Sequence, residues 1–117
     1  MSDTNFLVDP NPQMEASDMT DASQFTTDDH TELNHSHFNT SDEKLLTGTW
    51  ECAPTKEVIE AYPVHEMMTI VSGKITLTHK DGRKEHLGAG DVFFIAKGQF
   101  VVWEITETLR KIYMIVE

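Results

Sequence analysis

Apolar and polar residues alternate with a period of two from residue 45 to the end of the chain. Such alternation places successive side chains on opposite faces of a strand. It predicts strands over 45–52, 56–61, 64–72, 74–80, 83–88, 91–96, 100–106 and 109–116, after a first strand over about 31–40. No part of this region has the spacing of an amphipathic helix. The pattern therefore predicts an all-β fold, a closed or double-sheet antiparallel barrel.

The clearest turn signal is Asp81-Gly82, which separates the alternating runs 74–79 and 84–87. An Asp-Gly pair supplies the positive φ angles that a tight two-residue hairpin turn requires. We therefore expect 74–79 and 84–87 to form a hairpin closed by a two-residue turn.

The 117-residue chain has the length of one small domain. Its charged residues are unevenly distributed along the sequence. Residues 1–43 hold ten acidic residues and no Lys or Arg, whereas residues 44–117 hold ten acidic and nine basic residues. Residues 1–30 are polar, and their few apolar residues are scattered. We predict an acidic N-terminal arm over 1–30, flexible or docked on a partner subunit through Phe6, Leu7 and Val8, and a barrel domain over 31–117.

Several classes of partner are disfavoured by the composition. No basic stripe is present to contact nucleic acid or an anionic membrane surface. No apolar run approaches the roughly 20 residues that span a bilayer. The start of the chain lacks the basic and apolar regions of a signal peptide, so none is expected. A single cysteine, Cys52, excludes an internal disulfide. We expect a cytoplasmic protein that binds neither nucleic acid nor membranes.

Two segments resemble the motifs of the cupin superfamily. Glu66 to Gly73 resembles the end of the first motif, and Gly90 to Gly98 resembles the second, with a normal spacing of sixteen residues between Gly73 and Gly90. Further residues are similar to those of ureidoglycine-aminohydrolase-type cupins: Thr49-Trp50-Glu51, Tyr62-Pro63, Trp103-Glu104 and Arg110-Lys111. The resemblance covers about residues 45–117. It implies a double-stranded β-helix, or jelly-roll, for the domain over 31–117, and small cupins of this kind commonly pair through sheet edges as homodimers.

The resemblance also implies where a metal would bind, because metal-binding cupins supply two His and one Glu from the first motif and one His from the second. Glu66 occupies the Glu position. The His pair is replaced by the stretch 59–62, the His of the second motif by Val101, and the motif proline by Ala96. Glu66 is thus a weak candidate for holding a divalent transition metal, and no cofactor is expected.

Residues around Glu66 suggest a site without a metal. Glu60 and Tyr62 share its strand parity and could line the same cavity, where two carboxylates would suit a cation, an amine or acid–base chemistry. Alternatively, Glu66 is a structural carboxylate hydrogen-bonded to Tyr62 or to a Trp N–H. Trp103 and Trp50 are interpreted as core or pocket-wall residues that could stack on a ring or an ammonium group.

A possible chelate lies outside the cupin motifs, in His35-Ser36-His37. Alternate residues on a strand share a face, as two metal ligands would. The favoured interpretation is the polar face of the first strand, because no third ligand is visible nearby.

Three functions remain open at this stage, because cupins serve many functions. The favoured function is binding of a small polar metabolite, one that could carry an amine, through Glu66, Tyr62, Glu60 and Trp103. The alternatives are a metal-dependent enzyme that acts on a nitrogenous metabolite, and a structural or regulatory interaction protein. The sequence does not decide whether the protein is an enzyme.

Overall fold

A computed structural model describes residues 4–117. Strands dominate, and the helical content is one short 3-10 helix, η1 (Ala22–Gln24). The strands are β1 (Glu15–Ala16), β2 (Glu32–Asn39), β3 (Leu45–Cys52), β4 (Thr55–Ile59), β5 (His65–Thr78), β6 (Lys84–Leu87), β7 (Val92–Ile95) and β8 (Val101–Val116). No helix within residues 4–117 is long and apolar enough to cross a membrane.

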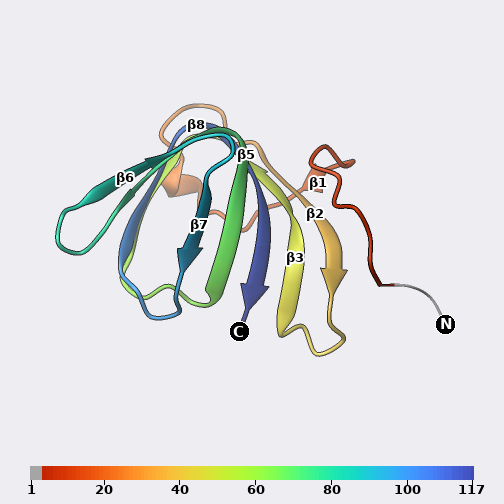
Figure 1. Ribbon diagram of the computed structural model, residues 1–117. Helices are drawn as coiled ribbons and strands as arrows, with labels where there is room; N and C mark the ends of the chain where they lie inside the picture. The colour runs from red at the N-terminus through yellow and green to blue at the C-terminus, as the bar shows by residue number, and fades with distance from the viewer. Residues whose placement is uncertain (1–3) are drawn as a thin grey trace.

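The strands form two layers that share β5 and β8 (Figure 1). One layer joins β2, β3, the second half of β8, the first half of β5, and β7. The other layer joins β4, the first half of β8, the second half of β5, and β6. All these pairings are antiparallel, and the arrangement is that of a jelly-roll. The all-β prediction is confirmed.

The hydrophobic core lies between the layers and draws on both. Its buried apolar residues are Cys52, Tyr62, Met68, Ile70, Ile75, Leu77, Ile95, Val101, Trp103, Ile105 and Leu109. Most of these side chains occupy alternate positions of β5 and β8, as the period of two predicts.

The predicted strand boundaries were wrong in two places, because β5 and β8 are each one long strand where two were expected. The register between β5 and β8 shifts at several points between Ile70 and Ile75. These bulges bend the strand from one layer into the other and change which parity faces inward. Gly73 lies in the bend with a φ of +86°. The alternation is therefore broken while the strand continues.

The hairpin between β5 and β6 forms as predicted, but its turn is different. Thr78 pairs with Lys84, the His79 N–H donates to the Arg83 carbonyl, and the Gly82 N–H donates to the His79 carbonyl. Within residues 4–117, Glu43 is the only non-glycine residue with positive φ, so Asp81 does not take the angle a two-residue turn would need. The loop is a three-residue type I turn in which Gly82, at φ +91°, provides the left-handed position.

The described part of the acidic segment runs along the outside of the barrel. β1 pairs with β2, and Phe25 forms a bridge with Thr55. Nη1 of Arg110 donates to the carbonyl of Pro10 at 3.1 Å. These contacts lie within one chain, and the division at residue 30 and the docking on a partner stay predictions.

Candidate functional site

A cavity of about 570 Å³ opens between the two layers. Its walls come mainly from β2, β3, β4, β8 and the loop 62–64, with Glu66 from β5, and the Met19–Thr20 segment borders it. The polar residues that line it include Glu32, Asn34, Ser36, Glu57, Glu66, Lys111 and Tyr113, and the apolar ones include Trp50, Ile59, Val64, Trp103 and Ile115. A volume of this size suits a small organic molecule.

The wall of the cavity contains a buried ion pair. Nζ of Lys111 donates to Oε2 of Glu66 at 2.5 Å, and the Tyr62 hydroxyl donates to Oε1 of Glu66 at 2.7 Å. The side chains of Lys111 and Glu66 are only 8% and 4% exposed. Burial and the adjacent Glu66 carboxylate raise the pKa of Tyr62, so its hydroxyl remains a proton donor at neutral pH. Both oxygens of Glu66 are thus occupied by the chain's own donors.

Three aromatic rings surround the Lys111 ammonium group. Nζ lies 4.8 Å from the ring centroid of Trp50, 4.7 Å from that of Trp103 and 5.8 Å from that of Tyr113. A cation at these distances is attracted by the negative faces of the rings, more strongly when water is excluded. We call Trp50, Trp103 and Tyr113 the aromatic box.

A second buried carboxylate, Glu32, holds the box in place. Its Oε2 accepts from Nε1 of Trp50 at 2.8 Å, and its Oε1 accepts from the backbone N–H of Thr20 at 2.9 Å. Glu32 therefore orients one ring of the box and ties the N-terminal segment to the rim of the cavity. The adjacent Cys52 is fully buried, and burial raises the pKa of its thiol to about 12, so the thiol stays protonated at neutral pH.

The charges around the cavity are unbalanced. Four glutamates line it, Glu32, Glu57, Glu66 and Glu117, against one cationic side chain, Lys111. Lys111 is paired with Glu66, and Glu32 accepts N–H donors. The side-chain carboxylate of Glu57 accepts no hydrogen bond from any group within residues 4–117, although its backbone pairs with β8. The cavity therefore has an excess of negative charge.

Three of the four predicted site residues lie together. Tyr62, Glu66 and Trp103 line the same cavity, and the rings of Tyr62 and Trp103 are stacked with centroids 6.5 Å apart. Glu60 lines a different hollow. Since β4 ends at Ile59, Glu60 lies in the loop that precedes β5, where the parity of a strand no longer determines direction.

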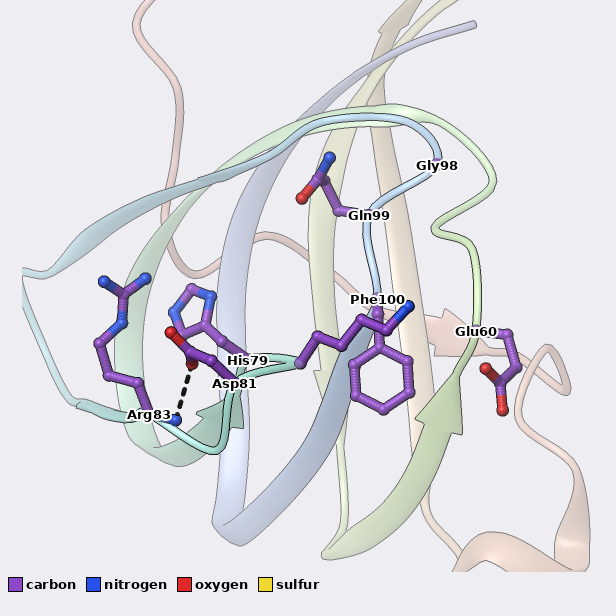
Figure 2. Close-up of a pocket in the computed structure, with 8 residues that line it drawn as sticks. Glu60, His79, Asp81, Arg83, Gly98, Gln99 and Phe100 are labelled. Carbon is purple, nitrogen blue, oxygen red and sulfur yellow. Dashed lines mark hydrogen bonds between the residues drawn. The ribbon is translucent and has the colours of Figure 1, made fainter.

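The hollow that contains Glu60 is shallow and polar (Figure 2). It has a volume of about 440 Å³ and is bordered by the hairpin loop and the 98–100 segment. Its charged residues, Glu60, Lys80, Asp81 and Arg83, are exposed and of both signs. This arrangement is that of a solvated surface, in contrast to the buried pair in the larger cavity.

Sequence reasoning missed the partner of Glu66. Lys111 has the same parity as Leu109 and Tyr113 in a strand that is apolar on both faces. A lysine at such a position is buried only if it is paired, so the parity was a signal that an acidic partner faces it. Glu32 gave no comparable signal, because its strand is mostly polar.

The residues at the expected cupin metal position do not fit a transition metal. Val101 is buried among apolar side chains, and both oxygens of Glu66 accept from Tyr62 and Lys111. A metal at Glu66 would lie beside a buried ammonium group, which repels it. Residues 4–117 contain no group of three or more His, Cys, Asp or Glu side chains arranged to hold a metal ion.

The two histidines of β2 lie on the outer side of the sheet, away from the cavity. Nδ1 of His35 is 3.0 Å from the Gln13 carbonyl, and Nε2 of His37 is 2.7 Å from Oγ1 of Thr49. Burial and the neighbouring His35 lower the pKa of His37, while Asp9 opposes this shift. The pair contacts the N-terminal segment and the sheet.

We expect this shift to make the folded state less stable in mild acid. A histidine with a lowered folded-state pKa binds a proton more readily when unfolded, so stability is lost as pH falls below 6.5, the ordinary value. Urea unfolding of the wild type between neutral and mildly acidic pH measures this loss, which His37→Gln should reduce. The same change at His86, which is exposed on the hairpin, is the control, and an equal reduction there would contradict the assignment.

Comparisons with known proteins agree with the jelly-roll. The model of the EutQ-like cupin domain family matches residues 40–113. A protein of unknown function of the DUF861 family from Pseudomonas syringae pv. tomato aligns with a TM-score of 0.83 and 23% identity over 93% of this chain and 46% of its own. The chain thus spans about half the length of that relative. No curated protein matches it significantly.

Two further structures extend the comparison. One, assigned as ethanolamine utilization protein Q of Salmonella typhimurium, has a TM-score of 0.61 and 18% identity over 91% of this chain and 95% of its own. A DUF861 family protein from Thermotoga maritima has a TM-score of 0.51 and 31% identity over 56% of this chain and 73% of its own. The narrower ureidoglycine-aminohydrolase type is not confirmed by these matches. The family match covers most of the chain, which therefore belongs to the EutQ-like cupin family.

Proposed function

We propose that the cavity binds a small amine-bearing metabolite without the help of a metal ion. The observation that carries this proposal is the excess of carboxylates over ammonium groups in the cavity lining. A cationic ligand reduces this excess, whereas an anionic ligand increases it. We propose binding only, and no reaction.

The aromatic box supports the same ligand class. The ammonium group of Lys111 already lies inside this cavity, in contact with Glu66 and the aromatic rings. Its apolar stem also shows that the walls accept aliphatic carbon next to the charge. A ligand with one amine and a short carbon skeleton resembles the Lys111 side chain, because it also joins an ammonium group to aliphatic carbon.

Glu57 is the residue that we expect to bind the ligand amine, since the charge of Glu66 is already neutralised by Lys111. It lies on β4 opposite Trp103, and both side chains line the cavity. Its charge also contributes to the raised pKa of Tyr62. An ammonium group beside Glu57 would therefore contact a carboxylate and lie close to the rings of Trp103 and Tyr62.

The name of one relative guides the choice of probes. The Salmonella protein is assigned to ethanolamine utilization, and ethanolamine is a short amine of the proposed class. At 18% identity this likeness shows the fold alone, so ethanolamine is one probe among several.

Isothermal titration calorimetry with matched probes tests the proposal. Ethanolamine, ethylene glycol and glycolate share a two-carbon skeleton and differ in charge, and butylamine and butyrate form a second set. We expect the amines to bind and the neutral and anionic analogues to bind at least tenfold more weakly. Equal binding of amine and carboxylate probes, or binding of the carboxylates alone, would overturn it.

A pair of glutamate variants locates the binding. Glu57→Gln should weaken amine binding about tenfold, which corresponds to the loss of one charged hydrogen bond. Glu60→Gln, in the shallow hollow, is the matched control and should leave the affinity unchanged. An equal loss in both variants would indicate a general effect of protein charge.

Elemental analysis tests the metal-independent part of the proposal. The purified, untagged protein should contain Mn, Fe, Ni and Zn well below one ion per chain. A nearly stoichiometric metal that disappears in Glu66→Gln would overturn this part and favour the metal-dependent alternative.

A further inference from the structure

A buried hydroxyl group borders the cavity without a partner in the chain. Thr55, the first residue of β4, is 2% exposed and lines the cavity. Its side chain makes no hydrogen bond with any group in residues 4–117, whereas every fully buried side-chain nitrogen or oxygen in this range has a partner. The Thr55 hydroxyl oxygen is therefore not fully enclosed, and the cavity is the space that the residue borders.

A valine would fill the position of Thr55 equally well if only packing mattered. Thr55 is the strand partner of the buried Ile105 on β8 and forms the bridge with Phe25, and both of these neighbours are apolar. Valine has nearly the shape of threonine, and a buried hydroxyl without a partner costs free energy. A molecule bound in the cavity would supply the partner that the chain does not.

Thr55 and Glu57 present a hydroxyl and a carboxylate on the same side of β4. They occupy alternate positions of the strand, and both line the cavity. Two residues of a strand rise about 7 Å. A nitrogen atom that lies between the two side chains, with hydrogen bonds of about 2.9 Å to each, spans about 6 Å. One ammonium group can therefore reach both side chains.

The aromatic rings of the cavity are already engaged by groups of the chain itself. Nζ of Lys111 lies 4.7 Å from the ring centroid of Trp103, and the ring of Tyr62 is stacked on that of Trp103. A ligand cation that relied on ring faces alone, such as a fully methylated ammonium group, would compete with Lys111 for them. Glu57 and Thr55 offer free acceptors instead, and these require a cation with N–H groups.

We propose that the ligand is an amine with at least two N–H groups in its charged form, as in a primary amine, and that Thr55 and Glu57 bind it together. The amine binding proposed above is the basis of this assignment, which narrows the ligand class by excluding fully methylated amines. One N–H donates to the Glu57 carboxylate, which also compensates the charge, and a second donates to Oγ1 of Thr55. Thr55 is thus a ligand-binding residue that neither motif nor parity indicated.

Calorimetry of the full chain with two cations of equal charge and chain length tests the proposal. Protonated butylamine has N–H groups, and butyltrimethylammonium has none. We expect the wild type to bind butylamine at least tenfold more tightly. Thr55→Val removes the hydroxyl and keeps the shape, so it should weaken butylamine binding about tenfold, through the loss of one hydrogen bond to a charged group. The same change should leave the affinity for butyltrimethylammonium unaltered.

Two further variants separate the hydroxyl from packing. Thr55→Ser keeps the hydroxyl and loses a methyl group, so it should retain most of the affinity for butylamine. Thr76→Val is the matched control, because Thr76 is also a strand threonine but hydrogen-bonds to His86 and does not line the cavity. Urea unfolding of ligand-free Thr55→Val should give a midpoint no lower than that of the wild type, because the variant buries no hydroxyl without a partner.

The contrary outcomes are distinct from failure of the proposed function. Unchanged butylamine binding by Thr55→Val, an equal loss for both cations, or an equal loss in Thr55→Ser or Thr76→Val would overturn the role of Thr55 alone. A clearly lower urea midpoint for Thr55→Val would also contradict it, because the hydroxyl would then stabilise the fold itself. Equal binding of the two cations by the wild type would overturn the requirement for N–H groups. If neither cation binds, the proposed function fails and this assignment fails with it.

Discussion

Replacing Lys111 with methionine is expected to destabilise the protein by about 3–5 kcal/mol, because it leaves the buried Glu66 carboxylate without a cation. Methionine retains most of the aliphatic volume, so the loss measures the missing charge and not a cavity. Urea unfolding followed by tryptophan fluorescence gives the free energy of unfolding of each variant.

A double variant separates the ion pair from packing. Glu66→Gln alone should also be destabilising, because it leaves the buried ammonium group unpaired. The double variant Lys111→Met/Glu66→Gln should lose much less stability than the two single variants lose together. The difference, which is the coupling energy of the two side chains, should be about 2 kcal/mol or more. Additive losses would show that the two side chains do not act as a pair.

The surface pair between Lys74 and Glu107 is the control for Lys111. Its atoms are 3.9 Å apart, and the side chains are 68% and 62% exposed. Lys74→Met should change stability by less than about 1 kcal/mol, as is usual for exposed ion pairs. A similar loss for Lys74→Met and Lys111→Met would contradict the importance of burial.

The second large effect is expected for Gly73→Ala, at the bend of β5. A Cβ at this position would collide with the backbone carbonyl group of Thr108, and the φ of +86° is one that residues with a side chain rarely adopt. We expect the free energy of unfolding to fall by about 3 kcal/mol or more, because the backbone conformation and the steric overlap both destabilise the variant. Thermal and urea unfolding measure it.

Gly82→Ala isolates the contribution of the backbone angle. Gly82 has a φ of +91°, but a Cβ there would meet no atom within 4 Å. Gly82→Ala should lower the free energy of unfolding by about 1–2 kcal/mol, the cost of the left-handed conformation alone. If both variants lost the same amount, the close approach of β5 and β8 at the bend would have no energetic role.

The fold was predictable because local signals and the period of two agree along most of the chain. β3, β6 and β7 begin and end close to the predicted positions, and Gly82 provides the left-handed turn. β5 and β8 were each predicted as two strands, because bulges interrupt the alternation without ending the pairing. Such a bend depends on contacts between strands that are distant in sequence, which no local pattern contains.

The site was predictable only in part, for a similar reason. Glu66 was assigned from its motif, Trp103 as an aromatic wall residue and Tyr62 by parity, and all three line one cavity. Tyr62 nevertheless lies in the loop between β4 and β5, so parity does not explain its direction. The pairing of Glu66 with Lys111 joins residues 45 positions apart. They come together because β5 and β8 are neighbouring strands and both side chains face the cavity, although the register places Ile115 opposite Glu66. Glu60 was assigned by parity beyond the end of β4, where parity no longer applies.

The central position of β8 has a consequence for how the protein folds during synthesis. β8 pairs with β3, β4 and β5, yet it is the last of the described strands to leave the ribosome. Until residues 101–116 emerge, β3 lacks one of its two neighbours and β4 has only the bridge from Thr55 to Phe25. Long-range strand pairing of this kind is slow, and unpaired edges stay exposed meanwhile. We therefore expect nascent chains stalled before residue 101 to be protease-sensitive and to require chaperones, with protection arising in one step once β8 is released.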